Sequence, residues 1–135
     1  MKLFNKVKKD ENGYIQIDVN PLLDWNGKGP EGCIASDKIT KDGWKVGYMY
    51  REEPTEGMPD SGWRFLKGDE SPEYMNNSDN HHVFALNTIC NYDSDIIPYL
   101  EMEIGTVLIR TEGGKFVPDD RTQAVRMEKQ KLPYN

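Results

Sequence analysis

Apolar and polar residues alternate with a period of two in several short runs of this 135-residue chain, a pattern typical of β-strands. The run YIQIDV (Tyr14–Val19) follows the turn-forming pair Asn12-Gly13 and is predicted to form the first strand. Further along, two β-rich runs lie on either side of Asp42-Gly43, a strong signal for a tight turn. We therefore predict a β-hairpin over Cys33–Arg51.

The same period assigns faces to the residues of the next two runs. In the second arm of the hairpin, one face collects large side chains, namely Trp44, Val46, Tyr48 and Tyr50. Met49 would then point to the opposite face. A further strand is predicted over 61–68, in which Trp63 and Phe65 share a face. We expect the aromatic side chains of these two strands to pack together on the core side of a sheet.

Capping signals predict two short helices. Ser71 followed by Pro72 is typical of a helix that begins at the proline. A second helix is predicted over 92–103, with Asp93 or Ser94 as its N-cap and an acidic first turn that suits the helix dipole.

Three segments complete the predicted fold. The apolar run 82–91 indicates a buried strand, and 105–119 indicates a second hairpin that turns at Gly113-Gly114. The tail 121–135 is compatible with a short helix or a frayed end. The elements together predict a single α+β domain built on a mainly antiparallel sheet with two or three short helices.

The composition limits the size of the core. Hydrophobic residues make up 36% of the chain and the mean hydropathy is −0.79, yet 10% aromatic residues argue against disorder. The core is therefore expected to rest on few large side chains, including Trp25, Trp44 and Trp63. Cys33 and Cys90 match no metal-binding spacing and are expected to be buried thiols. Because no secretory signal and no membrane-length apolar run occur, we expect a cytoplasmic protein.

The acidic residues are unevenly distributed along the chain, which has a net charge of −6. The segment 68–109 contains eight acidic side chains and no Lys or Arg, whereas basic and acidic residues cancel over 1–67. This distribution disfavours nucleic acid as a partner and favours a protein with a basic surface.

Known motifs indicate no catalytic, cofactor-binding or metal-binding residues. The segment GKGPEG (Gly27–Gly32) has the spacing of a dinucleotide fingerprint but lacks the strand and helix around it, so we interpret it as a turn-rich linker. Adjacent His81 and His82 would point to opposite sides of an extended chain and are interpreted as part of a polar turn. Ser61 and the cysteines lack the neighbours that nucleophilic catalysis requires.

The most charge-rich stretch is MYREEPTEGMPDSGWRFLKGDE (Met49–Glu70). Its two predicted strands are joined by an acidic connection from Glu52 to Asp60 that is longer than a usual hairpin loop, which favours a functional role. Arg51 and Arg64 flank this loop and are expected to clamp it through charge-assisted hydrogen bonds. The candidate partner-binding residues are Glu52, Glu53, Glu56, Asp60, Asp69 and Glu70. The residues expected to form their scaffold are Gly47, Tyr50, Arg51, Gly62, Trp63, Phe65 and Gly68.

An ordered series of segments, from SDKIT through DGWKVGYMYREEP, DSGWRF and GDE to LNTICNYDSDIIPYLEMEIGT, resembles a bacterial family classed among the immunity proteins of polymorphic toxin systems (family thirty-three, Imm33). The resemblance covers about residues 33–106 and leaves the segments 1–32 and 107–135 outside. Ser94 stands where the family often has proline. The matching positions are Ser36, Asp37, Gly47, Tyr50, Arg51, Glu52, Pro54, Asp60, Ser61, Gly62, Trp63, Phe65, Gly68, Asp69, Glu70, Asn87, Thr88, Asp93, Ile97, Pro98 and Leu100.

The resemblance implies a binding protein without enzymatic activity or cofactor, which neutralises a cognate toxin by occluding it. The expected partner is a basic toxin domain such as a nuclease, and neither nucleic acid nor a membrane is expected as a partner. Two alternatives stay open on the residues alone. One is a metal-dependent hydrolase that uses the region of Asp60, Asp69, Glu70 and His81. The other is a general protein-interaction module unrelated to toxins.

Overall fold

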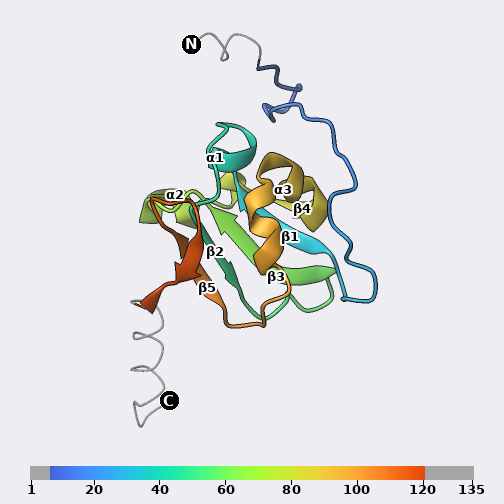
Figure 1. The fold of residues 1–135 in the computed structure, drawn as a ribbon. Helices are drawn as coiled ribbons and strands as arrows, with labels where there is room; N and C mark the ends of the chain where they lie inside the picture. Colours follow the sequence, from blue (N-terminus) through green and yellow to red (C-terminus); the bar gives the residue numbers. More distant parts are fainter. Residues whose placement is uncertain (1–6, 121–135) are drawn as a thin grey trace.

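The computed structural model describes residues 7–120, which form an α+β domain around a six-stranded sheet (Figure 1). The strand order is β4-β1-β3-β2-β5-β6; β1 and β3 are parallel, and the other neighbouring pairs are antiparallel. The prediction of a single α+β domain on a mainly antiparallel sheet is thus confirmed. The strands are β1 (Gly32–Ser36), β2 (Tyr48–Arg51), β3 (Asp60–Leu66), β4 (His81–Ala85), β5 (Val107–Arg110) and β6 (Phe116–Pro118).

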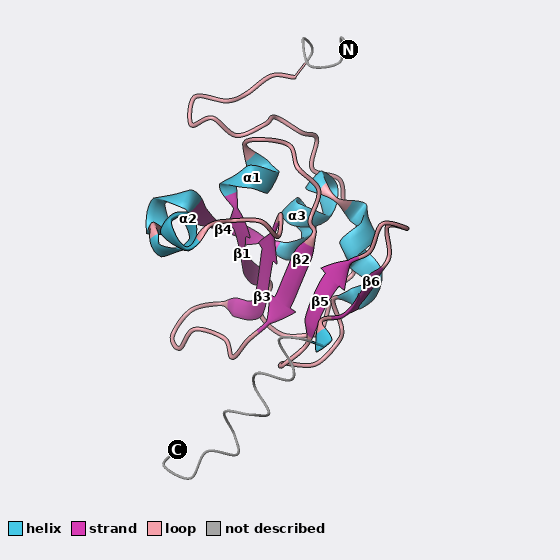
Figure 2. Cartoon of the chain, turned by 90° about the vertical axis from the view of Figure 1, so that its left-hand side faces the viewer, coloured by secondary structure: helices cyan, strands magenta, loops and turns pink. Residues whose placement is uncertain are grey.

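Short helical segments connect the strands. Figure 1 shows α1 and α3 on one side of the sheet and α2 on the other, and in Figure 2 α2 lies next to the edge strand β4. Within the described part of the chain, no helix is both long and apolar enough to cross a membrane. The segments are the α-helices α1 (Asp37–Thr40), α2 (Pro72–Asn76) and α3 (Leu86–Tyr92), and the 3₁₀ helices η2 (Ser78–Asn80) and η3 (Ser94–Tyr99).

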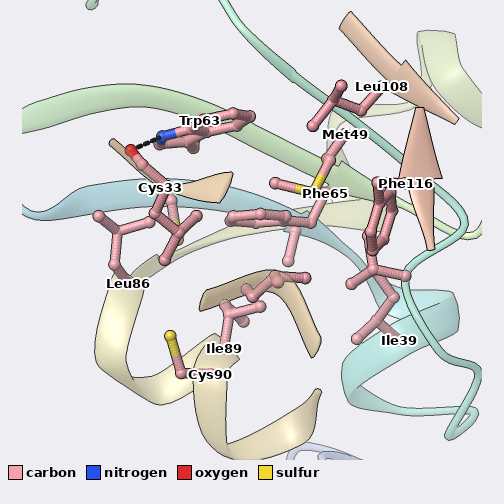
Figure 3. Packing of buried hydrophobic residues seen from close by; sticks show 14 of the residues in the cluster. Cys33, Ile39, Met49, Trp63, Phe65, Leu86, Ile89, Cys90, Leu108 and Phe116 are labelled. Atoms are coloured by element: carbon pink, nitrogen blue, oxygen red, sulfur yellow. Dashed lines mark hydrogen bonds between the residues drawn. The ribbon is translucent and has the colours of Figure 1, made fainter. Parts of the chain in front are cut away.

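The hydrophobic core lies between the sheet and the layer formed by α1, α3 and η3 (Figure 3). Trp63 and Phe65 project into it from the central strand β3, with ring centroids 6.0 Å apart. The indole Nε1 of Trp63 donates a hydrogen bond of 2.8 Å to the carbonyl oxygen of Leu100, so burial leaves this polar group satisfied. Both layers contribute further members, including Cys33, Ala35, Ile39, Met49, Leu86, Ile89, Cys90, Ile96, Leu108 and Phe116.

The two cysteines are free and buried, as predicted. Burial raises the pKa of the Cys90 thiol to about 11 and also raises the pKa of Cys33. Both side chains therefore serve as small apolar core residues rather than as reactive thiols.

The expected faces of β2 are reversed. Met49 lies opposite Phe65 and is fully buried, whereas Tyr48 and Tyr50 lie on the other face of the sheet, opposite Leu66 and Arg64. The prediction was wrong because the residues before Tyr48 are not in a strand, so the period of two does not extend from the buried Val46 into β2. A second consequence is that Trp44, expected in the core, is 54% exposed.

The predicted hairpin over 33–51 does not form, because β3 lies between β1 and β2 in the sheet. The side chain of Ser36 accepts a hydrogen bond from the backbone N–H of Lys38 and starts α1 where the hairpin arm would have continued. The Asp42-Gly43 turn follows the end of this helix: Gly43 has φ +84° and its N–H bonds the carbonyl oxygen of Ile39 at 3.3 Å.

Within residues 7–120, the predicted strand Tyr14–Val19 is reduced to one antiparallel bridge between Lys9 and Ile15 across the Asn12-Gly13 turn. In this described part of the chain, the residues after the turn join no strand of the sheet. They run along α3 instead, where Asn87 and Asn91 hydrogen-bond the backbone near Asn20.

The apolar run 82–91 was expected to be one strand but divides into two elements. Edge strand β4 ends at Ala85, and α3 begins at Leu86 and buries Leu86, Ile89 and Cys90, whose three- and four-residue spacing matches one helix face. His81 and His82 belong to β4 rather than to a polar turn.

The predicted caps of the two helices are confirmed, but the helix expected over 92–103 is only the 3₁₀ helix η3, because Tyr92 belongs to α3 and η3 ends at Tyr99. Ser71 caps α2 with Pro72 at its first position, and Asp93 rather than Ser94 caps η3. The hairpin expected within 105–119 is formed by β5 and β6. The interpretation of 121–135 concerns residues outside the described part of the chain.

Two tryptophans offer a matched test of the core. Trp63→Ala should destabilise the protein by about 3–5 kcal/mol, because it leaves a cavity at the centre of the sheet. Trp44→Ala should cost less than about 1 kcal/mol, because Trp44 is largely exposed and its ring makes a cation–π contact with Lys67 at the surface. Urea unfolding of both variants measures the difference. Equal losses would contradict the described position of the core.

Candidate functional site

The exposed loop from Glu52 to Pro59 joins β2 to β3 and extends beyond the end of the sheet (Figure 2). Asp60 holds the end of the loop that leads into β3. Its Oδ2 accepts a hydrogen bond of 2.7 Å from the N–H of Thr55, and its Oδ1 accepts one of 2.9 Å from the N–H of Gly62. One carboxylate therefore ties the middle of the loop to the start of β3.

The buried guanidinium group of Arg64 connects both ends of this loop. Its Nη1 and Nη2 donate to the two oxygens of Asp60 at 2.9 and 2.7 Å, and its Nε donates to Glu52 at 2.6 Å. The side chains of Arg64 and Asp60 are only 6% and 9% exposed, whereas Glu52 is about half exposed. The bidentate pair is the strong form of this interaction, so the predicted clamp by Arg64 is present.

The electrostatics of this network favour the charged forms. The hydrogen bond from Arg64 is the main reason that the pKa of Asp60 lies well below its ordinary value of 3.8, and the N–H groups of Thr55 and Gly62 act in the same direction. Burial alone would lower the pKa of Arg64, but its hydrogen bonds with Asp60 and Glu52 outweigh burial and raise it.

Gly62 lets the two strands approach at the base of the loop. It has φ +93°, a region that side chains disfavour, and a Cβ at this position would overlap the carbonyl oxygen of Glu52. Because that oxygen belongs to the residue where the loop begins, a side chain at Gly62 would displace the loop itself.

Arg51 clamps backbone rather than carboxylates, which differs from the prediction. Its Nε donates to the carbonyl oxygen of Ser61 at 2.9 Å and its Nη1 to that of Met102 at 2.8 Å. The guanidinium also lies 5.9 Å from the ring centroids of Trp25 and Trp63, and its burial lowers its pKa. It therefore joins the base of the loop to the chain after η3.

Among the candidate contact residues of the loop, the structure separates two roles. Glu53 and Glu56 are exposed, and their side chains make no ion pair or hydrogen bond with residues 7–120. Asp60 is only 7% exposed and fully engaged, so it shapes the loop rather than lying on its surface. Glu52 has both roles. It pairs with Arg64 at the base of the loop, yet the side chain of Glu52 is still 49% exposed.

Asp69 and Glu70 belong to a separate turn after β3. Asp69 lies between Lys38 and Lys67, with N–O distances of 3.1 and 2.5 Å. The carboxylate of Glu70 accepts hydrogen bonds of 2.8 Å from the N–H groups of Lys67 and Gly68. Both acids thus stabilise this turn, and the structure does not give them the unpaired exposure of Glu53 and Glu56.

The face of the sheet opposite the core was not recognised from the sequence as a surface. It carries Tyr48 and Tyr50 from β2, which lie with ring centroids 5.9 Å apart, and burial raises the pKa of Tyr50. We call this surface the outer face; its residues are Ile34, Tyr48, Tyr50, Arg64, Leu66, Val83, Val107, Ile109 and Val117. The alternation within β3, which sets Arg64 and Leu66 opposite Trp63 and Phe65, was the signal that could have revealed it.

Two grooves hollow the outer face. One of about 460 Å³ lies where Gly47, just before β2, meets the turn after β3 that contains Lys67 and Gly68, and another of about 360 Å³ runs between Tyr50 and β4. At the turn, the N–H of Gly47 donates to the carbonyl oxygen of Leu66 at 2.9 Å. The scaffold residues Gly47 and Gly68 therefore border a surface groove, whereas Trp63 and Phe65 lie in the core.

The residues considered for a hydrolase do not form a metal site. Asp60, Asp69 and Glu70 are engaged as described above, and His81 packs its ring edge-on against Tyr74 at 5.6 Å. The neighbouring His82 contacts Asp37, with Nδ1 and Oδ1 2.9 Å apart. Within residues 7–120, no group of three or more His, Cys, Asp or Glu side chains has the arrangement needed to hold a metal ion.

Comparison with known families now identifies the domain. Residues 33–120 match the family model described as the immunity protein Imm33 domain. The chain belongs to the Imm33 family. The match includes the loop, the outer face and the hairpin β5–β6, so the Imm33 domain extends beyond the 33–106 block in which the resemblance was recognised. A search of curated proteins and a search of solved structures gave no match.

Two glycines of the loop region test the close approach of the strands. Gly62→Ala should destabilise the protein by about 3 kcal/mol, because it combines an unfavourable φ with overlap of the Glu52 carbonyl group. Gly57→Ala provides the control, because Gly57 also has a positive φ of +80° but open space around it, and should cost about 1 kcal/mol. Thermal or urea unfolding gives both values; a larger effect at Gly57 would refute this account of the loop base.

Stability should depend on acid through Asp60. Its pKa is lower in the folded than in the unfolded protein, so the unfolded state binds more protons as the pH falls below about 5, and stability is lost progressively between about pH 5 and pH 2. Asp60→Asn should cost about 3 kcal/mol at pH 7, because the buried charge of Arg64 would then be paired with Glu52 and no longer with Asp60. The same substitution should weaken the dependence of stability on acid. Urea unfolding at several pH values measures how the free energy of unfolding depends on pH. Asp18→Asn serves as the control, because Asp18 is exposed. An unchanged slope in Asp60→Asn would contradict the role of the pair.

Proposed function

We propose that this Imm33 protein neutralises a cognate toxin by binding it and covering its active surface, without catalysing a reaction. Membership of the immunity family supports a toxin as the partner. The observation that carries the mode of binding is the pair of exposed carboxylates of Glu53 and Glu56, which have no ion-pair or hydrogen-bond partner among residues 7–120, on a loop whose base is rigidly held. Such a loop fits a basic protein surface, for example that of a nuclease toxin.

The held base of the loop favours tight binding. Association normally loses free energy when a mobile loop becomes ordered, and a loop that is ordered beforehand avoids much of that loss. Here Arg64, Asp60 and Arg51 fix both ends, while the tip between them stays accessible. In this proposal Glu53 and Glu56 contact the toxin, and Asp60 positions them.

The remaining candidate acids have secondary roles. The exposed part of Glu52 can contribute to the contact, whereas Asp69 and Glu70 act at most at its border, because they stabilise the turn after β3. Opposite charge on the toxin would accelerate encounter and disfavour wrong partners. We place the encounter in the cytoplasm, which agrees with free thiols at Cys33 and Cys90.

Co-expression with the product of the gene immediately upstream tests this function. The wild-type protein should protect cells from that product and copurify with it. The double variant Glu53→Lys/Glu56→Lys should bind it about tenfold more weakly and with a smaller salt dependence, because two attractive charges become repulsive. Calorimetry or surface plasmon resonance at two salt concentrations measures this.

The control for this experiment is Glu11→Lys/Glu112→Lys, which changes the net charge equally at exposed sites outside the loop and should bind like wild type. If the wild-type protein neither protects cells from the upstream gene product nor copurifies with it, the immunity function is rejected. Protection with unchanged affinity in the loop variant would reject only the contact through Glu53 and Glu56.

A further inference from the structure

A mainly apolar pocket of about 300 Å³ lies beside the acidic loop and is assigned no role by the proposal above. Met58 and Pro59 line it from the loop, and Ile34 and Val83 line it from β1 and β4 of the outer face. The loop therefore has two distinct parts: a charged tip with Glu53 and Glu56, and an apolar inner side that forms one wall of a pocket.

The walls of this pocket include two strongly exposed apolar side chains. Val83 is 66% exposed and Met58 is 54% exposed. Val83 pairs with Ile34 across the two strands at this edge of the sheet, and both residues also line the adjoining groove of about 360 Å³. An apolar patch that continues through a pocket into a groove is typical of an interaction site, whereas isolated exposed apolar residues are not.

The two segments that flank this apolar surface carry exposed acidic residues. Glu53 and Glu56 lie on the loop side, and the exposed Glu73 and Asp79 lie in α2 and η2, which contribute Met75, Asn76 and Ser78 to the adjoining groove. The segment 68–109, which contains α2, η2 and β4, has no Lys or Arg. An apolar centre within a charged rim is the usual anatomy of a protein–protein interface.

We propose that this pocket receives a large aliphatic or aromatic side chain that projects from the basic surface of the toxin. The inference rests on the proposed function and identifies the part of the partner that the site recognises. The acidic rim would pair with Lys or Arg residues around this apolar anchor, and desolvation of the anchor would supply most of the affinity. The flexible thioether of Met58 can adapt to the shape of the inserted side chain.

Charge argues against a second copy of this chain as the occupant. Two copies meeting at this surface would bring the same acidic rims together, and each chain has a net charge of −6. A basic partner relieves this repulsion, so complementary charge selects a toxin surface over self-association.

Val83→Asp separates the apolar contact from electrostatic attraction. The substitution adds an acidic group at a site facing a basic partner, so electrostatics alone predicts equal or stronger binding. Burial of the anchor against Val83 predicts instead a loss of affinity of about tenfold or more, because a charge would lie in the apolar pocket. The probe is the purified upstream gene product, titrated calorimetrically against the full-length immunity protein.

Val117→Asp is the matched control, because Val117 is also an exposed strand valine, 40% exposed, but lies on β6 at the opposite edge of the sheet. It should bind like wild type. Circular dichroism checks folding, and Met58→Asp on the loop provides a second pocket variant if Val83→Asp does not fold. Equal losses at Val83 and Val117 would overturn the assignment of the pocket.

The outcomes also distinguish this inference from the function on which it rests. If the wild-type protein does not bind the probe, both fail. If the wild-type protein binds and the Glu53/Glu56 variant is weakened while both pocket variants bind normally, the immunity function stands and the pocket has no part in it. Sedimentation of the immunity protein alone tests the remaining occupant: concentration-dependent dimers that Val83→Asp abolishes would replace the toxin anchor by a second copy.

Discussion

The buried guanidinium of Arg64 is the constraint on which the geometry of the loop depends. A charge that is only 6% exposed is strongly destabilising unless it is paired and hydrogen-bonded, and here Asp60 and Glu52 provide both. Because these acids stand at the two ends of the loop, neutralising one arginine also fixes where the loop leaves β2 and where it enters β3. The position of the exposed Glu53 and Glu56 is thus a consequence of a charge buried in the sheet.

Strand β3 separates the stability of the domain from its surface chemistry. On one side, Trp63 and Phe65 fill the core, and the indole of Trp63 is held by the carbonyl group of Leu100. On the other side, Arg64 and Leu66 belong to the outer face, with the tyrosines of β2 beside them. A strand buried at every residue can serve both functions because successive side chains point in opposite directions. Substitutions at exposed positions of the outer face, such as Val83, can therefore alter the surface without opening the core.

The accuracy of the sequence-based predictions followed the range of the interactions involved. Ser71 was recognised as a helix cap, Asp93 as one of two candidate caps, and Gly113-Gly114 as a hairpin turn, because each signal acts within a few residues. Asp42-Gly43 was also recognised as a turn, but it ends a helical segment instead of joining two paired strands. The prediction failed there because β3, which is distant in the sequence, occupies the place between β1 and β2.

The sequence by itself determined the α+β class, the family, the alternation within β3 and the acidic character of the loop, since these follow from residue type and short-range spacing. Only the tertiary structure decided which acids remain accessible, because the pairing of Asp60 with Arg64 depends on how the strand and loop close on one another. It also decided that Tyr48 and Tyr50 face away from the core, and that Met58 of the loop meets Val83 of β4 in one pocket. Such contacts join residues far apart in the chain, and no local pattern specifies them.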